Sequence, residues 1–234
     1  MGKGKRLRNA KQEKFKRVTF SKYTTANVKQ MVEAHKNNPE MVNYLLDGID
    51  YYEAQYKKDK KKPNRESAAN MYCLTVDRMI ESSKKEKSNI EISKKIACKK
   101  GCSYCCYIHV GITDDEAYVL MEHAKDIGLK IDKEALKIQS TMDHTDWDTL
   151  PRKYQKCVFL GDDGCCSVYK HRPIACRKYL VLDSSEQCEK GPGNLARVYN
   201  DYRSEILASG VMNATKYGSM PKMILKEMEN ASNT

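Results

Sequence analysis

The sequence lacks the segments that place a protein in or across a membrane. It contains no run of about 18 apolar residues, the length a helix needs to span a bilayer. The first residues, MGKGKRLRNAKQEKFKR, have no apolar stretch and no small-residue cleavage site, so they do not form a secretory signal. We therefore expect a cytoplasmic protein that is not bound to membranes.

The motifs of several enzyme classes are missing as well. There is no Gly-rich loop after a strand, no nucleophile elbow, no phosphate loop and no H-E-x-x-H helix. The carboxylates of Asp114, Asp115 and Glu116 are better explained by helix capping than by acid–base catalysis. The residues therefore predict no catalytic group, and they leave open whether the protein is an enzyme.

The composition is that of a globular, basic protein. Of the 234 residues 40% are apolar and 31% are charged, with a mean hydropathy of −0.73. This is enough apolar surface to form a core. The formal net charge of +11 favours an acidic partner such as nucleic acid. Because helical spacing predominates and neither a strand-rich region nor an internal repeat is present, the predicted fold class is mainly α.

Four segments are expected along the chain. Residues 1–22 form a basic tail, residues 23–87 a helical region, residues 88–190 a cysteine-rich domain, and residues 191–234 C-terminal helices that pack on it. In the tail Glu13 is the only acidic residue among many lysines and arginines. We expect this tail to be disordered and to contact nucleic acid or an acidic protein.

Local signals predict where helices begin and end. Asn38 and Pro39 are typical of a helix cap and first turn, and the charged run 57–64 is predicted to be a linker. The sequences SNIE (88–91) and TDDE (113–116) are two predicted capping boxes. A late helix is predicted through four apolar positions, Leu195, Val198, Tyr202 and Ile206.

The chain has ten cysteines, and most of them are clustered. Cys73 stands alone on a helical face and is expected to be a buried structural thiol. The other nine lie in two groups, within residues 98–106 (CKKGCSYCC) and residues 157–188. In a reducing cytosol such cysteines are metal ligands more often than disulfides.

The spacing of these cysteines suits a tetrahedral metal. Its sulfur ligands lie about 2.3 Å from the ion, and C-x₃-C and C-x₂-C spacings let one turn direct two thiolates at it. Gly101 supplies a permissive backbone within that turn. Adjacent side chains diverge, so one of Cys105 and Cys106 is expected to serve a different ion or to bridge. The GDDG turn (161–164) is expected to present Cys166 beside Cys157.

The cysteine pattern also resembles a known family. CKKGCSYCC, CVFL and GCCSVYKHRPIACRKY, followed by Cys188, resemble the YkgJ-like cysteine-cluster family, which is described as zinc- or iron-chelating. The likeness covers about residues 90–190 and includes VGITDDEA after the first group. It implies a cysteine-rich, loop-and-helix metal-binding domain. The implied metal ligands are Cys98, Cys102, Cys105, Cys106, Cys157, Cys166, Cys176 and Cys188.

Other residues near the motif have weaker assignments. Cys165 departs from the family pattern and is an alternative ligand. Arg172 and Arg177 belong to the Arg-Pro-x-x-Cys-Arg element, and we expect them to offset thiolate charge and donate N–H groups to sulfur. His109 and His171 can replace a sulfur, but the eight cysteines are preferred.

The metal stays undecided at this point. Thiolates suit zinc and iron–sulfur clusters equally, and two zinc ions with four sulfurs each account for eight cysteines. Cys98, Cys102 and Cys105 also have the spacing of radical S-adenosylmethionine enzymes, but the strand patterns of those enzymes are missing. A cluster held by protein sulfurs is therefore preferred.

Three functions remain open. The first is a metal-binding cysteine-cluster protein, with a sensing or redox role as one variant. The second is an S-adenosylmethionine-dependent protein lysine methyltransferase-like enzyme, implied by the resemblance to the cysteine domain of flagellin lysine N-methylases. The third is a metal-stabilised nucleic-acid or protein-binding module, which would show salt-sensitive binding.

Overall fold

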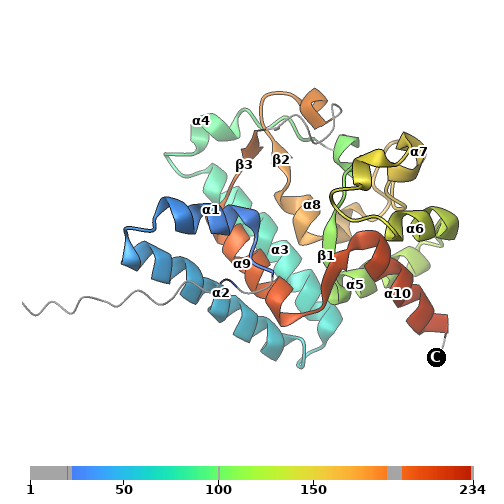
Figure 1. Cartoon of the computed structure of the whole chain (residues 1–234), viewed down its shortest axis with the longest axis horizontal. Helices are drawn as coiled ribbons and strands as arrows, with labels where there is room; N and C mark the ends of the chain where they lie inside the picture. Colours follow the sequence, from blue (N-terminus) through green and yellow to red (C-terminus); the bar gives the residue numbers. More distant parts are fainter. Residues whose placement is uncertain (1–19, 21–22, 100, 189–196, 233–234) are drawn as a thin grey trace, which may run out of the picture.

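The structure, a computed structural model, describes residues 20, 23–99, 101–188 and 197–232 (Figure 1). The predicted tail, residues 1–22, lies outside the described residues except for Phe20. The described part of the N-terminal region begins at Tyr23. Most described residues are helical. The α-helices are Ala26–Ala34 (α1), Pro39–Asp59 (α2), Arg65–Lys84 (α3), Ile90–Ser93 (α4), Asp114–Asp126 (α5), Lys133–Ser140 (α6), Arg152–Gln155 (α7), Ile174–Lys178 (α8), Tyr202–Ala214 (α9) and Met220–Ser232 (α10).

The remaining regular elements are short. The strands are Gly111–Thr113 (β1), Leu180–Val181 (β2), Val198–Tyr199 (β3) and Tyr217–Ser219 (β4). They form two antiparallel pairs, β1 with β4 and β2 with β3. The short 3-10 helices are Tyr104–Tyr107 (η1), Trp147–Thr149 (η2), Tyr169–His171 (η3) and Ser185–Cys188 (η4). The predicted class, mainly α, is confirmed.

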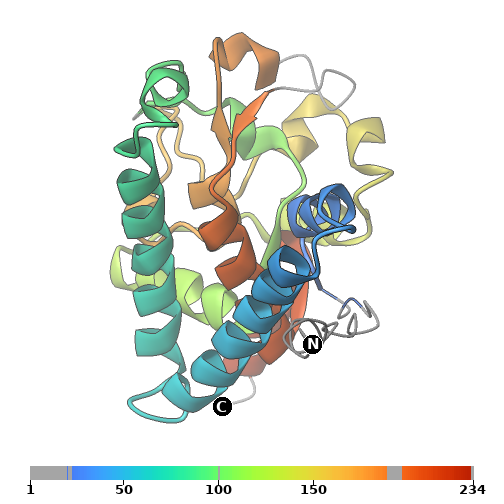
Figure 2. The ribbon, with the colours of Figure 1, turned by 90° about the vertical axis from the view of Figure 1, so that its left-hand side faces the viewer.

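The helix α2 lies along α9, as Figure 2 shows. Buried Val42, Leu45 and Ile49 of α2 pack against Ile206 of α9. Gly210 allows the two helices to approach closely, because a Cβ atom there would lie 2.8 Å from the Ile49 carbonyl oxygen. The longest helix of the N-terminal region is therefore fixed against an element near the C-terminus.

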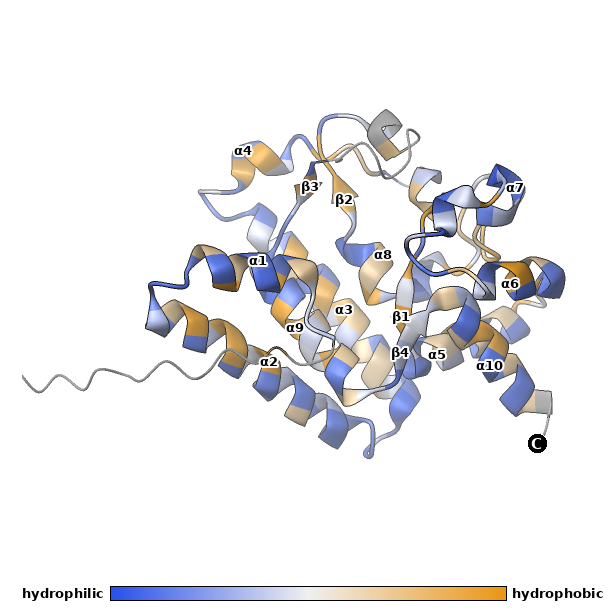
Figure 3. Cartoon of the chain, in the orientation of Figure 1, coloured by the Kyte–Doolittle hydropathy of each residue, from blue (hydrophilic) through white to orange (hydrophobic). Residues whose placement is uncertain are grey.

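The helix α3 connects this layer to the cysteine-rich segment. Its buried Tyr72 and Val76 belong to a core that also contains Ile174 of α8, Leu182 after β2, and Leu207 of α9. Figure 3 shows hydrophobic and hydrophilic residues alternating along α2 and α10, as expected for helices with one buried side. The cysteine-rich segment thus shares an apolar core with the N-terminal helices.

A second core lies under the cysteines. It contains Leu120 of α5, Leu136 of α6, Phe159, Val168 and Ile224 of α10, all nearly inaccessible to solvent. Cys157, Cys166 and Cys176 pack against its edge. Apolar side chains of this core therefore pack directly against three of the cysteines.

Two of the predicted helix starts are confirmed. The Asn38 side chain accepts a hydrogen bond from Met41 N, and Pro39 is the first residue of α2. Thr113 and Glu116 form the predicted capping box at the start of α5. Gly128 follows this helix with a positive φ of 64°, the conformation that ends many helices.

Three local predictions were wrong. The helix α2 continues to Asp59, so the linker at 57–64 is shorter than predicted. The SNIE box does not form, because α4 begins at Ile90 after Asn89. The Asn89 amide is directed to Ser83 O instead. The late helix begins only at Tyr202, since Val198 pairs in β3, and the predicted position Leu195 lies outside the described residues.

Within the described ranges, none of the helices has both the length and the apolar character needed to cross a lipid bilayer.

Candidate metal centre

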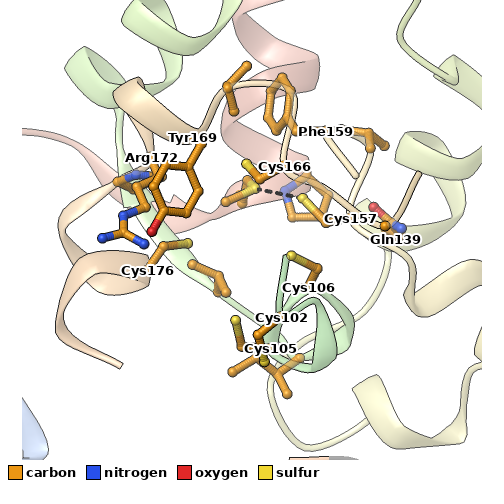
Figure 4. A pocket seen from close by; sticks show the side chains of 18 of the residues that line it. Cys102, Cys105, Cys106, Gln139, Cys157, Phe159, Cys166, Tyr169, Arg172 and Cys176 are labelled. Atoms are coloured by element: carbon orange, nitrogen blue, oxygen red, sulfur yellow. Dashed lines mark hydrogen bonds between the residues drawn. The ribbon is translucent and has the colours of Figure 1, made fainter. Parts of the chain in front are cut away.

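Six cysteines line one pocket in the cysteine-rich segment. The pocket has a volume of about 100 Å³, and Figure 4 shows these side chains around it. They come from η1 and the residues before it, from the turn around Gly164, and from α8. The six are Cys102, Cys105, Cys106, Cys157, Cys166 and Cys176. Elements far apart in the sequence thus contribute sulfur to one place.

A tight turn presents the first cysteines. Gly101 has a φ of +87°, which favours glycine, and Cys102 N donates to Lys99 O at 3.0 Å. Cys106 N donates to Ser103 O at 2.9 Å, and this hydrogen bond closes the first turn of the short helix η1. The permissive Gly101 turn predicted from the spacing is present.

The GDDG sequence folds the second group back on itself. Gly164 has a φ of +73°, and Gly161 N donates to Cys165 O at 2.9 Å. Leu160 and Cys166 form an antiparallel bridge. The turn therefore returns the chain toward Cys157, as predicted, and both cysteines line the pocket.

Backbone contacts fix the cysteine segments relative to one another. Cys157 N donates to Cys106 O at 2.7 Å, which ties the second group to η1. The helix α8, which carries Cys176, begins where Ile174 N donates to Glu116 Oε1 at 2.8 Å. Because Glu116 is also the capping residue of α5, it fixes α8 against that helix.

Cys98 and Cys188 lie apart from the pocket lining. Val181 N donates to Cys98 Sγ at 3.2 Å, which holds this thiol beside β2. Cys188 is 7% exposed in η4, and η4 lies against η1. Burial raises the pKa of the Cys188 thiol to about 11, and the nearby thiols of Cys98, Cys105 and Cys102 add to the increase.

The thiols of the pocket influence one another in the same way. Burial raises the pKa of Cys157 to about 12, with smaller contributions from Cys166 and Cys105. Burial also raises the pKa of Cys176, and Cys157, Cys105 and Cys166 again contribute. The interaction between the adjacent thiols of Cys105 and Cys106 lowers the pKa of Cys105 and raises that of Cys106.

The effects of the thiols on one another's pKa are consistent with two neighbouring groups among the eight predicted ligands. Cys98, Cys102 and Cys188 form the outer group, and Cys102 also lines the pocket. The pocket group comprises Cys106, Cys157, Cys166 and Cys176. Cys105 interacts with members of both, so it lies between them.

The donor chemistry of this region fits a soft metal, but the thiols do not form a finished ligand set. No three or more histidine, cysteine, aspartate or glutamate side chains of the described residues converge closely enough to hold an ion. Burial raises the pKa of the Cys157 thiol to about 12 and that of the Cys188 thiol to about 11, so these two thiols are protonated at neutral pH. Metal binding must therefore release protons and draw the sulfurs together.

The two arginines of the Arg-Pro-x-x-Cys-Arg element have different surroundings. Arg172 lines the pocket, stacks on the Tyr169 ring with 4.3 Å from Cζ to the ring centroid, and lowers the pKa of the Cys105 thiol. Its Nε is buried without a hydrogen-bond partner among the described residues. Arg177 is 4% exposed and donates to Arg172 O and to Asp77. Arg172 thus faces the thiols, while Arg177 holds the backbone around Cys176.

The remaining candidate ligands have other neighbours. Cys165 is partly exposed and is not among the residues that line the pocket, although it lies near Cys166. Cys73 is buried, and its Sγ lies 3.9 Å from Glu116 Oε1. His109 stacks with His144 at 5.7 Å between ring centroids. His171 contacts His123 with 4.2 Å between centroids.

Comparison with known families identifies this segment. Residues 97–191 match the CxxCxxCC family model, described as "Putative zinc- or iron-chelating domain". Residues 97–191 are thus similar to a cysteine-cluster family. The matched range contains all eight predicted ligands and Cys165. It does not distinguish zinc from iron. Searches among curated proteins and among solved structures found no match to the chain.

One sulfur at the pocket was not anticipated from the sequence. Met220, the first residue of α10, lines the pocket, and its Sδ lies 4.0 Å from Cys157 Sγ. Methionines at helical spacing in a C-terminal segment are ordinary core residues, so the sequence carries no signal for this position. It depends on the pairing of β4 with β1, which spans about a hundred residues of chain.

Proposed function

We propose that the cysteine-rich segment binds two metal centres through its eight family cysteines. The outer centre would use Cys98, Cys102, Cys105 and Cys188, and the pocket centre would use Cys106, Cys157, Cys166 and Cys176. The protein is then a metal-binding protein in which zinc or iron is held by thiolates from several short elements.

Two geometric observations support this proposal: six of the eight cysteines line one pocket, and η4, which carries Cys188, lies against η1. Four thiolates per ion is the usual number for a structural zinc site, and it also serves iron–sulfur clusters. The division explains why Cys105 and Cys106 are adjacent: successive residues in η1 can serve neighbouring centres. Arg172 supports a thiolate-rich site, because its positive charge offsets the negative charge of the bound thiolates.

The proposal is tested by substituting one cysteine of each group. Cys188→Ser should remove the metal of the outer centre, and Cys166→Ser should remove that of the pocket centre, each leaving the other metal in place. Cys73→Ser is the matched control, because it removes a buried thiol outside both groups. Metal content by mass spectrometry of the anaerobically purified proteins is the readout. Equal metal content in all three variants would overturn the proposal.

A second candidate, binding of an acidic macromolecule, is supported by a cluster of lysines. Lys57, Lys58, Lys61 and Lys62 line one surface hollow at the end of α2. Such a cluster attracts phosphate groups with a strong dependence on salt. If it binds DNA, the double variant Lys58→Glu/Lys61→Glu should weaken binding to a random duplex at low salt. An unchanged affinity would remove this candidate, whatever the metal content.

A further inference from the structure

Met220 reaches the cysteine pocket from outside the family-matched segment. It begins α10, is 7% exposed, and accepts a weak hydrogen bond from the Cys157 thiol across 4.0 Å (the dashed line at Cys157 in Figure 4). A thioether and a thiol therefore lie in contact at the pocket wall. Both are soft sulfur donors.

The backbone holds this methionine in place. Met220 N donates to Val110 O at 2.7 Å, and the preceding Ser219 pairs with Gly111 in the β1–β4 ladder. Val110 follows η1 by only a few residues, so the position of Met220 is tied to the segment that carries Cys105 and Cys106. The contact with Cys157 is thus built from two sides, since Cys157 N is itself bonded to Cys106 O.

The separation of the two sulfurs fits a shared ion. Two sulfurs bound at about 2.3 Å, with angles between about 109° and 120° at the metal, lie roughly 3.8–4.0 Å apart. The observed separation is 4.0 Å. The pair needs no rearrangement of its backbone to hold one ion between its sulfurs.

Charge and softness select the metal. Thiolate and thioether together favour Cu(I), whereas zinc takes thiolate, imidazole and carboxylate ligands. One thiolate and one neutral thioether cancel the charge of a singly charged ion, and a neutral third donor completes the three-coordinate geometry that the 4.0 Å separation fits. Leu136 and Phe159, which also line the pocket, are apolar and almost inaccessible to solvent. A neutral complex avoids the free-energy cost of placing net charge there.

We propose that Cys157 and Met220 together bind Cu(I), with the Cys157 proton released to solvent. The inference rests on the proposed function in one respect: Cys157 is also assigned to the pocket centre. Copper therefore competes with zinc or iron for that sulfur. The outer group does not contain Cys157, so copper at this site does not compete with the metal of the outer centre.

The test uses the full chain, reduced and metal-free, with its methionine methyl groups labelled with ¹³C. One equivalent of Cu(I) should shift the Met220 methyl resonance, while that of Met223 stays in place. Met223 is the matched control because it lies on the same helix, is 8% exposed and packs in the same core. The resonances are assigned with Met220→Leu and Met223→Leu, and through contacts to Val110 if the first variant does not fold.

Affinity gives a second measurement. Loss of groups that only orient a ligand lowers metal affinity about 10–100-fold, so loss of a ligand should cost at least about tenfold. We expect Met220→Leu to weaken the first Cu(I) equivalent by this factor in competition with a Cu(I) chelator. Met223→Leu should bind as the wild type does.

The outcomes separate the two proposals. If the protein binds Cu(I) and the Met220 methyl resonance does not shift, the assignment of Met220 as a ligand is overturned. The proposal is also overturned if the protein binds no Cu(I). A parallel titration with Zn(II) tests the thiolate centres alone, since Met220→Leu should leave zinc stoichiometry unchanged. If the wild-type protein does not bind zinc in this titration, the proposed function is overturned instead.

Discussion

The N-terminal helices and the cysteine-rich segment become buried by different means. The helices α2 and α3 are 21 and 20 residues long, and their cores are aliphatic and aromatic. The elements that carry the cysteines are short: η1 has four residues and α8 has five. Isolated helices of that length are not stable in water. The first region can be held by apolar packing, whereas the second needs links between its loops.

The metal centres of the proposal supply those links. A structural zinc ion contributes on the order of 10 kcal/mol to folding in small metal-binding domains. The apolar core next to the pocket and the Glu116 contact also hold parts of the cysteine segment in place. In this proposal, apolar packing stabilises the N-terminal helices and metal ligation stabilises the cysteine-rich segment.

The largest effect is expected from metal removal. A chelator should raise amide hydrogen exchange across residues 101–106 and 157–178, because the short elements lose their links. The helices α2 and α3 should keep most of their protection, since their cores do not contain metal ligands. Hydrogen exchange with mass spectrometry measures both regions at once. Equal loss of protection in both regions would contradict the comparison.

A substitution in the core of the N-terminal helices should lower stability without lowering metal content. Leu207 of α9 is fully buried against α3, so Leu207→Ala should lower the free energy of unfolding by about 2–5 kcal/mol. The folded variant should keep its full metal content. Leu74→Ala is the control, because Leu74 is 47% exposed on α3 and should change stability by less than about 0.5 kcal/mol. Denaturant unfolding together with metal analysis is the measurement. Metal loss from folded Leu207→Ala would contradict the separation of the regions.

Arg172 tests how a nearby positive charge affects metal binding by the cysteines. The interaction with Cys106 lowers the pKa of the Cys105 thiol and burial raises that of the Cys166 thiol, and at both the Arg172 guanidinium adds a smaller contribution that favours the thiolate form that binds metal. We expect Arg172→Gln to lower metal affinity about 10–100-fold. Arg172→Lys keeps the charge and should recover part of that loss. Chelator competition at several pH values is the measurement, with the defect of the Gln variant shrinking as pH rises. A defect independent of pH would assign Arg172 a purely structural role.

Glu116 lies where the two regions meet, because the Cys73 thiol of α3 is 3.9 Å from its Oε1, and its substitution should give a smaller effect. It accepts hydrogen bonds from Thr113 N and Ile174 N, and burial raises the pKa of its carboxyl above the ordinary 4.5. Because the folded state binds this proton more tightly, stability should fall as pH rises from about 4.5 through the raised pKa. Glu116→Gln cannot ionise and should remove that component, while costing about 1–3 kcal/mol through lost acceptors.

The measurement for Glu116 is denaturant unfolding of both proteins from about pH 4, near the ordinary pKa of a glutamate, upward through neutral pH. Glu91→Gln is the control, since the Glu91 side chain is 82% exposed. A difference between wild type and Glu116→Gln that does not vary with pH would show that the carboxyl does not titrate there.

The smallest effect is expected at Cys165. Its thiol does not line the pocket, and the family pattern passes through Cys166 instead. Cys165→Ser should leave metal content and unfolding free energy unchanged within about 0.5 kcal/mol. Loss of one metal equivalent in this variant would make Cys165 a ligand and would displace Cys166 from the pocket centre.

The sequence predicted features that depend on neighbouring residues. The Asn38 cap, the Thr113–Glu116 capping box and the turn that returns Cys166 toward Cys157 all follow from side chains or glycines within a few positions. The domain boundaries, including the one between residues 87 and 88, stay predictions. The family match supports metal binding, and the assignment of individual ligands stays a prediction too.

Features that depend on distant contacts were not predicted. Val198 carried a helical pattern but joins β3, because Leu180 and Val181 provide a strand partner. Ser88 and Glu91 matched a capping box, yet α4 begins after Asn89, whose amide donates to Ser83 O and Ser83 Oγ at the end of α3. Met220 reaches the pocket only through the β1–β4 ladder. In each case a tertiary partner outweighs the local preference.

The most direct test of the account is elemental analysis of the anaerobically purified full chain for iron, zinc and acid-labile sulfide. The account predicts two thiolate centres, which means about two zinc ions per chain, or iron with sulfide in place of one or both. A folded, monodisperse protein with neither metal, and with its eight thiols titrating as ordinary free cysteines, would contradict it.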